Sequence, residues 1–168
     1  MSTQNSLDYH YQMTKGRLAE TIIEELFLAN DYEVHRFGME NMVPGLVRRL
    51  RYNDSPVSSQ IKKMPDFIMK KGDQIHFVEV KYRSDGKFSY EHLEKDDKVY
   101  PYKDCILILV SRDKIKALSV KELQSGQTIT AECNNYLGYR KEFGLDQQTI
   151  KDNLQIVKVF FQNAPGKL

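Results

Sequence analysis

Three charged residues lie within two short apolar segments of this sequence. Residues 64–83 read MPDFIMKKGDQIHFVEVKYR, with Asp66 in the first apolar run and Glu79 and Lys81 in the second. Charged groups are costly to bury unless a partner compensates them. Carboxylates can hold a hard divalent cation, and a nearby lysine can offset the charge of a phosphate ester. The three side chains are therefore the first candidates for a functional site.

The spacing of the two runs predicts how these side chains meet. The Gly-Asp pair at residues 72–73 is typical of a two-residue β-hairpin loop. With that loop, Asp66 lies directly opposite Glu79, at a Cβ separation of about 4.5–5.5 Å. Two carboxylates so close repel each other, and a divalent cation between them would reverse that interaction. Because side chains alternate along a strand, Lys81 shares the face of Glu79, although a longer loop would change this register.

Other parts of the sequence match the acid-x-lysine pattern less completely. The pattern recurs at Asp85 and Asp96, but only Glu79 follows an apolar strand with a Pro-Asp pair at hairpin distance. The alternative for this hairpin is a solvated edge whose charges have no function. The run FVEV is too apolar for a solvated edge, so we favour a functional site.

A helix is predicted to begin near Thr14. Its apolar residues recur at three- and four-residue spacing and form one stripe, made of Leu18, Ala19, Ile22, Ile23, Leu26 and Phe27. At 100° per residue, Glu20 and Glu25 flank this stripe at similar angles on opposite sides. The pattern therefore allows either glutamate to reach a neighbouring site.

The remaining pattern predicts one α/β domain over residues 1–168, with helices packed on a central sheet. Residues 1–13 are expected to be a loose arm, and residues 14–110 to form the core that bears the motif. The other predicted strands are YEVHRF, CILILV and LQIVKVFF. The other predicted helices are residues 89–98, SVKELQ and DQQTIKDNL.

The Pro-Asp pair at residues 65–66, the turn and the Glu-Val-Lys at residues 79–81 together resemble the signature of the PD-(D/E)xK nuclease superfamily. The resemblance covers about residues 14–110 and identifies no subfamily. It implies a restriction-endonuclease-like core, shared with Holliday-junction resolvases, in which α-helices flank a central mixed β-sheet. It also selects Glu20, since members usually carry a glutamate on the helix that precedes the motif strands.

The resemblance further implies a cofactor and a role for each motif residue. Mg²⁺, for which Mn²⁺ can substitute, would be bound by Asp66, Glu79 and the Val80 carbonyl. Glu20 would act through water or at a second metal. Lys81 would orient or deprotonate the attacking water and offset phosphate charge. The implied activity is hydrolysis of phosphodiester bonds in DNA, in repair, recombination or defence.

Positive charge is concentrated ahead of the motif. Between positions 36 and 71 there are eight Lys and Arg residues and three Asp and Glu residues, whereas the whole chain has a net charge of only +2. Such a surplus suits contact with phosphates, and a solvated basic loop is the alternative. The residues expected to bind nucleic acid are Arg48, Arg49, Arg51, Lys62, Lys63 and Arg83.

Double-stranded or branched DNA is the expected partner, and the many dimers in the superfamily also allow a homodimer. Two other functions stay open, namely a silent nuclease-like module that binds nucleic acid or assembles, and a nuclease that acts on RNA. No apolar run approaches the roughly 18 residues that a membrane-spanning helix needs. The polar N-terminus and the two cysteines, which form no metal or disulfide pattern, make the cytoplasm the expected setting.

Overall fold

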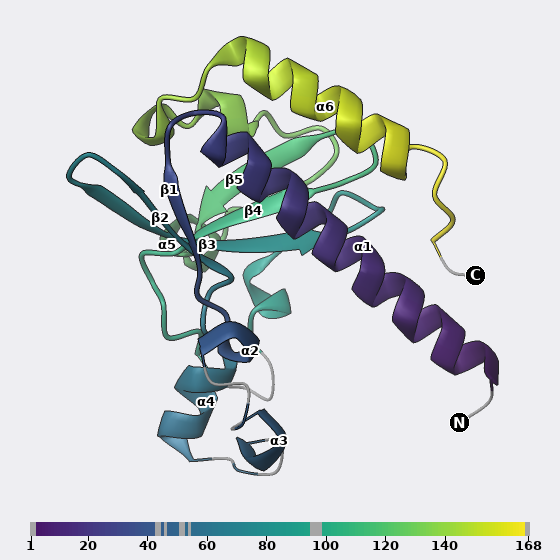
Figure 1. Cartoon of the computed structure of the whole chain (residues 1–168), viewed down its shortest axis with the longest axis vertical. Coiled ribbons are helices and arrows are strands. Elements are labelled where there is room, and N and C mark those ends of the chain that lie inside the picture. Colours follow the sequence, from purple (N-terminus) through teal and green to yellow (C-terminus); the bar gives the residue numbers. More distant parts are fainter. Residues whose placement is uncertain are drawn as a thin grey trace.

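A five-stranded mixed sheet forms the centre of the molecule, and helices pack on it (Figure 1). The strands follow one another across the sheet in chain order, and only the β3–β4 pair is parallel. The coarse prediction of an α/β domain with helices around a mixed sheet is confirmed. The computed structural model describes residues 3–42, 45, 47–50, 53, 55–94 and 99–166.

The elements alternate irregularly along the chain. The strands are β1 (Glu33–Arg36), β2 (Phe67–Lys71), β3 (Gln74–Tyr82), β4 (Ile106–Val110) and β5 (Ile115–Ser119). The α-helices are α1 (Thr3–Leu28), α2 (Met39–Met42), α3 (Val47–Leu50), α4 (Pro56–Lys62), α5 (Val120–Gln124) and α6 (Gln147–Phe161). Three short 3₁₀ turns complete the described elements: η1 (Tyr90–His92), η2 (Leu137–Tyr139) and η3 (Lys141–Phe143).

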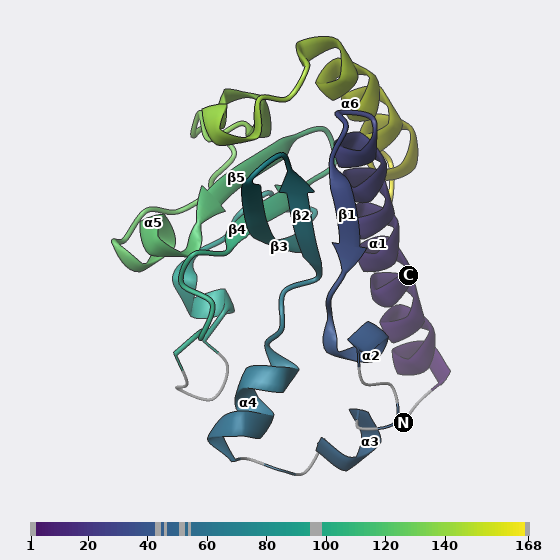
Figure 2. The same ribbon diagram turned by 60° about the vertical axis from the view of Figure 1, so that its left-hand side comes forward.

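The two faces of the sheet are covered differently. Val78 and Val80 of β3 face a hydrophobic cluster that includes the buried side of α1 and α6 (Figure 2). On the opposite face, Leu107 and Leu109 of β4 pack in a second cluster with α5 and with Phe88. Glu79 and Lys81 alternate with the two valines, so they lie on the face of the second cluster.

The prediction of a loose arm over residues 1–13 is wrong from Thr3 onward, because α1 is continuous through this segment. Tyr11 and Gln12 donate hydrogen bonds to the backbone carbonyls of residues 165 and 166, at 3.2 and 2.6 Å. These contacts join residues more than 150 positions apart, so no local pattern could reveal them. The part of α1 that follows Thr14 is the helix that the apolar stripe predicts.

The predicted strand LQIVKVFF is also wrong, because helix α6 continues to Phe161. Its β-branched and aromatic residues are typical of a strand. Val157 and Phe161, however, lie four positions apart and are buried, while Val159 between them is exposed. Helical burial against α1 therefore outweighs the intrinsic preference of these residues for strands.

Two other segments differ from expectation. The described part of residues 89–98 forms only the short turn η1, and residues 95–98 lie outside the described residues. Strand β5, whose sequence IKALS carries a lysine at its second position, was not predicted. The predicted strands YEVHRF and CILILV and the predicted helix SVKELQ are confirmed as β1, β4 and α5. None of the helices in the described ranges is long and apolar enough to cross a membrane.

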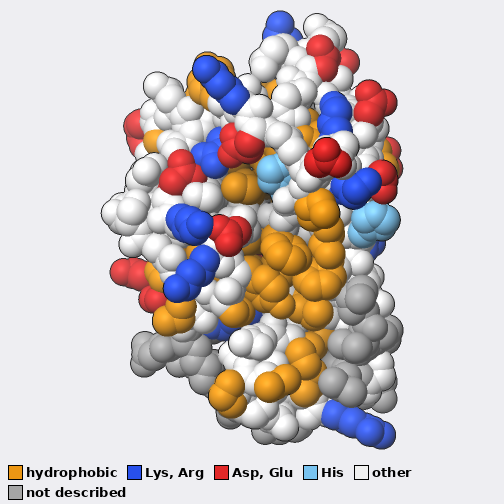
Figure 3. All heavy atoms as spheres, turned by 90° about the vertical axis from the view of Figure 1, so that its left-hand side faces the viewer, with side chains coloured by type: hydrophobic (Ala, Val, Ile, Leu, Met, Phe, Trp, Pro, Cys, Tyr) orange, Lys and Arg blue, Asp and Glu red, His pale blue; other side chains and the backbone are white. Residues whose placement is uncertain are grey.

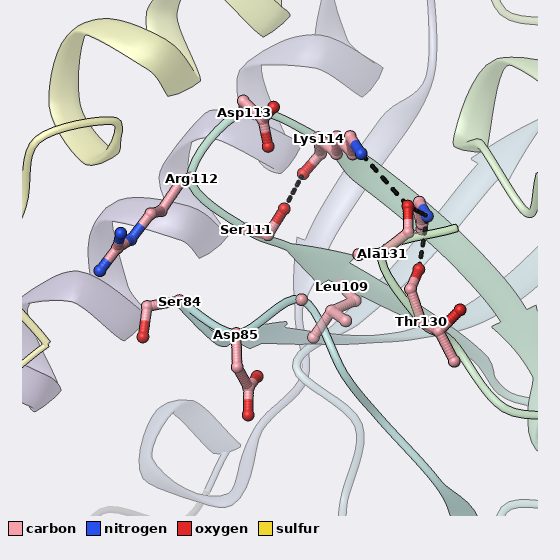
Figure 4. A pocket seen from close by; sticks show the side chains of 11 residues that line it. Ser84, Asp85, Leu109, Ser111, Arg112, Asp113, Lys114, Thr130 and Ala131 are labelled. Atoms are coloured by element: carbon pink, nitrogen blue, oxygen red, sulfur yellow. Dashed lines mark hydrogen bonds between the residues drawn. The ribbon is translucent and has the colours of Figure 1, made fainter. Parts of the chain in front are cut away.

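The lysine within β5, Lys116, is only 3% exposed, and it links β5 to a neighbouring segment by hydrogen bonds. It lies beside a pocket of about 160 Å³ at the carboxyl ends of β3 and β4 (Figure 4). Its ammonium donates hydrogen bonds to the carbonyls of Thr130, Ala131 and Cys133, at 2.5, 3.0 and 2.7 Å. These three carbonyls use the donors of Lys116, which thereby fastens the segment after α5 to the sheet.

We expect Lys116→Met to destabilise the fold by about 2–4 kcal/mol, because three carbonyls lose a charged donor in a buried position. Urea unfolding followed by circular dichroism measures this loss. The matched control is Lys114→Met, since Lys114 is less buried and donates to one of the same carbonyls, that of Ala131, at 3.2 Å. An equal loss of stability in the two variants would contradict this structural role of Lys116.

Candidate active site

The β2–β3 hairpin positions the acidic residues of the motif. The strands pair with Phe67 opposite Val78 and turn through residues 72–73, so the register predicted from a two-residue loop is confirmed. Continuing this register by one residue sets Asp66 opposite Glu79. The two carboxylates therefore approach each other at the point where the hairpin ladder ends.

Asp66 is held by backbone N–H groups from two segments. Its Oδ2 accepts a hydrogen bond from the Val80 N–H at 2.7 Å. Its own carbonyl accepts from the N–H groups of Phe37 and Gly38, at 2.8 and 3.3 Å. These contacts fix the Asp66 carboxylate between the end of β1 and the middle of β3.

Asp66, Glu79, Val80 and Lys81 together form what we call the corner. Pro65 also belongs beside it, because the continued register places Pro65 opposite Val80. Proline has no N–H, so it cannot donate a ladder hydrogen bond to the Val80 carbonyl. The Val80 N–H in turn bonds the Asp66 side chain. The Pro-Asp pair thus ends the ladder at the site and leaves the Val80 carbonyl without a donor from residue 65.

Glu79 and Lys81 extend from β3 on one face and form an ion pair between Glu79 Oε1 and Lys81 Nζ. The Glu79 side chain keeps 10% of its surface exposed, whereas that of Lys81 keeps 40%. The carboxylate is therefore almost fully enclosed, whereas part of the Lys81 side chain reaches solvent. An anion that arrives from solvent would meet Lys81 first.

Glu20 approaches the corner from α1, with 21% of its side chain exposed. Its Oε2 lies 3.8 Å from Nη1 of Arg36 on β1, and its charge interacts with both Asp66 and Lys81. Glu25, which the helical pattern allowed equally, is exposed. Of the two glutamates, the fold thus brings Glu20 toward the motif.

The protonation of Asp66 reflects an excess of negative charge. Burial, together with the carboxylates of Glu79 and Glu20, raises the pKa of Asp66 to about 8. Lys81 and the Val80 N–H oppose it but do not cancel it. At neutral pH the folded protein therefore favours a proton, or another cation, at this carboxyl group.

Lys81 remains charged in the same surroundings. Burial lowers the pKa of Lys81, but the nearby carboxylates of Glu79 and Asp66 outweigh burial and hold the pKa above its ordinary value. Lys81 is consequently an ammonium group at neutral pH. In that form it can neutralise an anionic ligand and cannot take a proton from water.

The oxygen donors of this corner suit a hard cation. Mg²⁺ is held in proteins by one or two carboxylates and completes its shell with water and phosphate oxygens. Asp66, Glu79 and the Val80 carbonyl supply such a set. Within the described residues, no group of three or more His, Cys, Asp or Glu side chains is arranged to hold a metal.

The described basic residues among those predicted to contact nucleic acid lie on α3, at the end of α4 and just after β3. Lys62 is exposed near the end of α4, where it donates to a backbone carbonyl at 2.7 Å, and Lys63 follows directly as the C-cap of this helix. Arg49 is exposed on α3. The side chain of Arg48 and the whole of Arg51 lie outside the described residues.

Arg83 lies two residues beyond Lys81 and directly follows β3. It bonds Asp85 through Nε at 3.1 Å and through Nη2 at 2.8 Å. Asp85 therefore offsets much of the charge that Arg83 was expected to offer to a phosphate.

Two further residues of the corner were missed by sequence reasoning. Arg36 bonds Glu24 of α1 through Nη2 and through Nε at 3.3 Å, and it also lies near Glu20. Tyr100 is buried next to Glu79, and burial together with the Glu79 charge raises the pKa of its hydroxyl. Neither residue has a fixed spacing from the motif. Side chains alternate between the two faces of the sheet along β1, and this alternation alone could have indicated on which face Arg36 lies.

Comparison with known proteins adds no relative. No family model, no curated protein and no solved structure matches this chain. The chemistry of the site is therefore inferred from its residues and geometry.

We expect Asp66→Asn to stabilise the metal-free protein at pH 8. A carboxyl group with a raised pKa makes the folded state less stable as pH increases from about 4 to 8, because the folded state then binds more protons than the unfolded state. Asparagine removes that dependence. The free energy of unfolding at pH 8 should increase by at least about 1 kcal/mol, which corresponds to roughly 2–4 °C in Tm for a chain of this size.

Thermal unfolding in EDTA at pH 5 and pH 8 measures the effect. The difference between wild type and Asp66→Asn should be larger at pH 8 than at pH 5. Asp104→Asn is the control, because Asp104 is exposed and pairs with Lys121 on the surface. A loss of stability at pH 8 in Asp66→Asn would show that the carboxylate is stabilising rather than strained.

Proposed function

We propose that this protein is a Mg²⁺-dependent nuclease with a PD-(D/E)xK site on a restriction-endonuclease-like core. The observation that carries the proposal is the position of Asp66 opposite Glu79, with Lys81 paired to Glu79 on the same face. The motif comes from the order of residues, whereas the register comes from backbone pairing. Their agreement in one enclosed corner favours a catalytic site over a solvated hairpin.

Each residue of the corner then has a chemical role. Asp66, Glu79 and the Val80 carbonyl would hold the ion, and Glu20 would orient a water molecule at its edge. Bound Mg²⁺ supplies an acidified water and neutralises charge on the phosphate. Lys81, as an ammonium group, would bind a phosphate oxygen and stabilise the charge that develops there. The raised pKa of Lys81 favours this electrostatic role over that of a general base.

DNA is the proposed substrate, with RNA as the alternative that the same site could hydrolyse. The lysines at the end of α4 precede the motif by only a few residues, so phosphates bound there would lie near the carboxylates. A cytoplasmic setting agrees with the two free cysteines, Cys105 and Cys133. A homodimer would fit the cutting of both strands of a duplex.

We expect the wild type to cut DNA in Mg²⁺ or Mn²⁺ and to be inactive in EDTA. Asp66→Ala, Glu79→Gln and Lys81→Met should each lower the rate by at least about 100-fold, because each removes charge that acts at the phosphate. Gel assays with supercoiled plasmid, branched DNA, single-stranded DNA and single-stranded RNA measure the rate and the preference among these substrates.

The control is the exposed pair Asp104 and Lys121, which carries the same residue types outside the corner. Asp104→Ala and Lys121→Met should retain full activity. Normal cleavage by Asp66→Ala and Lys81→Met would remove the site assignment. DNA binding without cleavage by any form of the protein would instead favour the silent binding module.

Metal binding can be tested without any substrate. Mg²⁺ at 10 mM should raise the Tm of the wild type by a few degrees, because a ligand that binds only the folded state stabilises it. Asp66→Asn and Glu79→Gln should lose most of this rise, although Asp66→Asn starts from a higher Tm. An equal rise in all three proteins would assign the effect to ions elsewhere on the surface.

A further inference from the structure

The sheet face that carries Glu79 is hydrophobic next to the carboxylates. Phe77 lies between Phe37 and Tyr102, with ring centroids 5.6 and 5.5 Å apart, respectively. Ile68 pairs with Phe77 across the hairpin and shares this face. All four side chains are partly exposed. We call these four residues the aromatic surface, and Figure 3 shows a broad hydrophobic area on this side of the molecule.

The aromatic surface lies directly next to the carboxylates of Asp66 and Glu79. Phe77 precedes Glu79 by two residues on the same face of β3, which corresponds to about 7 Å along a strand. Ile68 follows Asp66 by two residues on β2, and the Phe37 N–H bonds the Asp66 carbonyl at 2.8 Å. A ligand with its charged group at the corner would therefore extend its next part over these rings.

One side of this surface rests on the second hydrophobic cluster, against which Phe77 and Tyr102 pack, and the part nearer the hairpin turn is open. The core on the opposite face of β2 and β3 is formed with α1, whereas His35 and Ile75 on the open face keep 62% and 61% of their side chain or residue surface exposed. A contiguous exposed hydrophobic area on a soluble domain is uncommon and marks an interaction site. A partner that combines flat apolar groups with negative charge fits this area, because Lys62 and Lys63 end the helix that Tyr102 contacts, and Lys81 lies beyond Glu79 on the same face of β3.

Positive charge lies near the aromatic surface on the side of Tyr102. The Tyr102 hydroxyl donates to the Gln60 carbonyl of α4 at 3.4 Å, which ties the ring to this helix. Lys62 and Lys63 lie at the end of the same helix. Rings flanked by lysines match a strand whose bases are accessible and whose phosphates are spaced along its backbone.

We propose that the aromatic surface binds the unpaired bases of a single strand and so directs the site to single-stranded segments, such as those at branches or frayed ends. This inference rests on the proposed nuclease function and narrows its substrate. Every base has a face that stacks on an aromatic ring, whereas the bases of an intact duplex stack on each other and present only their edges. The surface thus distinguishes single-stranded from double-stranded nucleic acid and does not read the base sequence.

The test measures binding in EDTA, so that it does not depend on cleavage. Fluorescence anisotropy compares a labelled 15-residue oligothymidylate, an abasic oligonucleotide of equal length and charge, and a 15-base-pair duplex. The wild type should bind the oligothymidylate about tenfold more tightly than the abasic strand, since stacking of a base contributes about that factor. It should also prefer the oligothymidylate to the duplex.

Phe37→Leu and Phe77→Leu keep an apolar side chain but remove the ring, and each should reduce the preference for bases over the abasic strand at least threefold. Tyr139→Leu is the control, because Tyr139 is an exposed tyrosine on η2 outside this surface. It should leave the preference unchanged. Circular dichroism confirms that the variants fold, and the wild-type comparison alone decides the outcome if a variant does not.

Equal binding of the base-containing and abasic strands by the wild type would overturn the inference, as would tighter binding of the duplex. A wild-type dimer that Phe37→Leu dissociates, together with equal binding of both strands, would assign the surface to a second copy of the chain. Metal-dependent cleavage of duplex DNA with no base preference would overturn this inference and leave the proposed nuclease function standing.

Discussion

The rest of the site depends on one unfavourable contact, the approach of the Asp66 and Glu79 carboxylates across the β2–β3 ladder. The hairpin register imposes this approach, and hydrophobic packing on the other face of β3 holds the register in place. Lys81, Arg36 and the Val80 N–H each reduce the repulsion without removing it. The corner therefore holds more negative than positive charge, which explains why a carboxyl group with a raised pKa and a charged lysine coexist.

The hairpin could be predicted because its causes are local. A Gly-Asp turn sets the loop length, loop length sets the register, and alternation then assigns Glu79, Lys81 and Val80 to their faces. The stripe on α1 was readable for the same reason. The choice between Glu20 and Glu25 was not, because it depends on how α1 crosses the sheet.

Long-range contacts explain what the sequence left undetermined. The first turns of α1 are held by residues near position 165, and the last turns of α6 pack on α1 instead of joining the sheet. Phe37 and Tyr102 come from segments on either side of the hairpin and meet Phe77 only after the sheet forms. An aromatic residue in such a segment has no periodic neighbours that could reveal its side.

The parallel pairing of β3 with β4 has a consequence for how this protein could vary. Because the two strands run in the same direction, the chain must return along the sheet between Tyr82 and Ile106. That return brings Tyr100 and Tyr102 to the corner, although they contribute nothing to the hairpin. Tyr102 of the aromatic surface thus comes from a different stretch of sequence than the carboxylates and the lysine, whereas Ile68 and Phe77 share the hairpin with them. Under the proposed function, changes in the returning segment could alter which ligand is accepted while the carboxylates and the lysine stay in place.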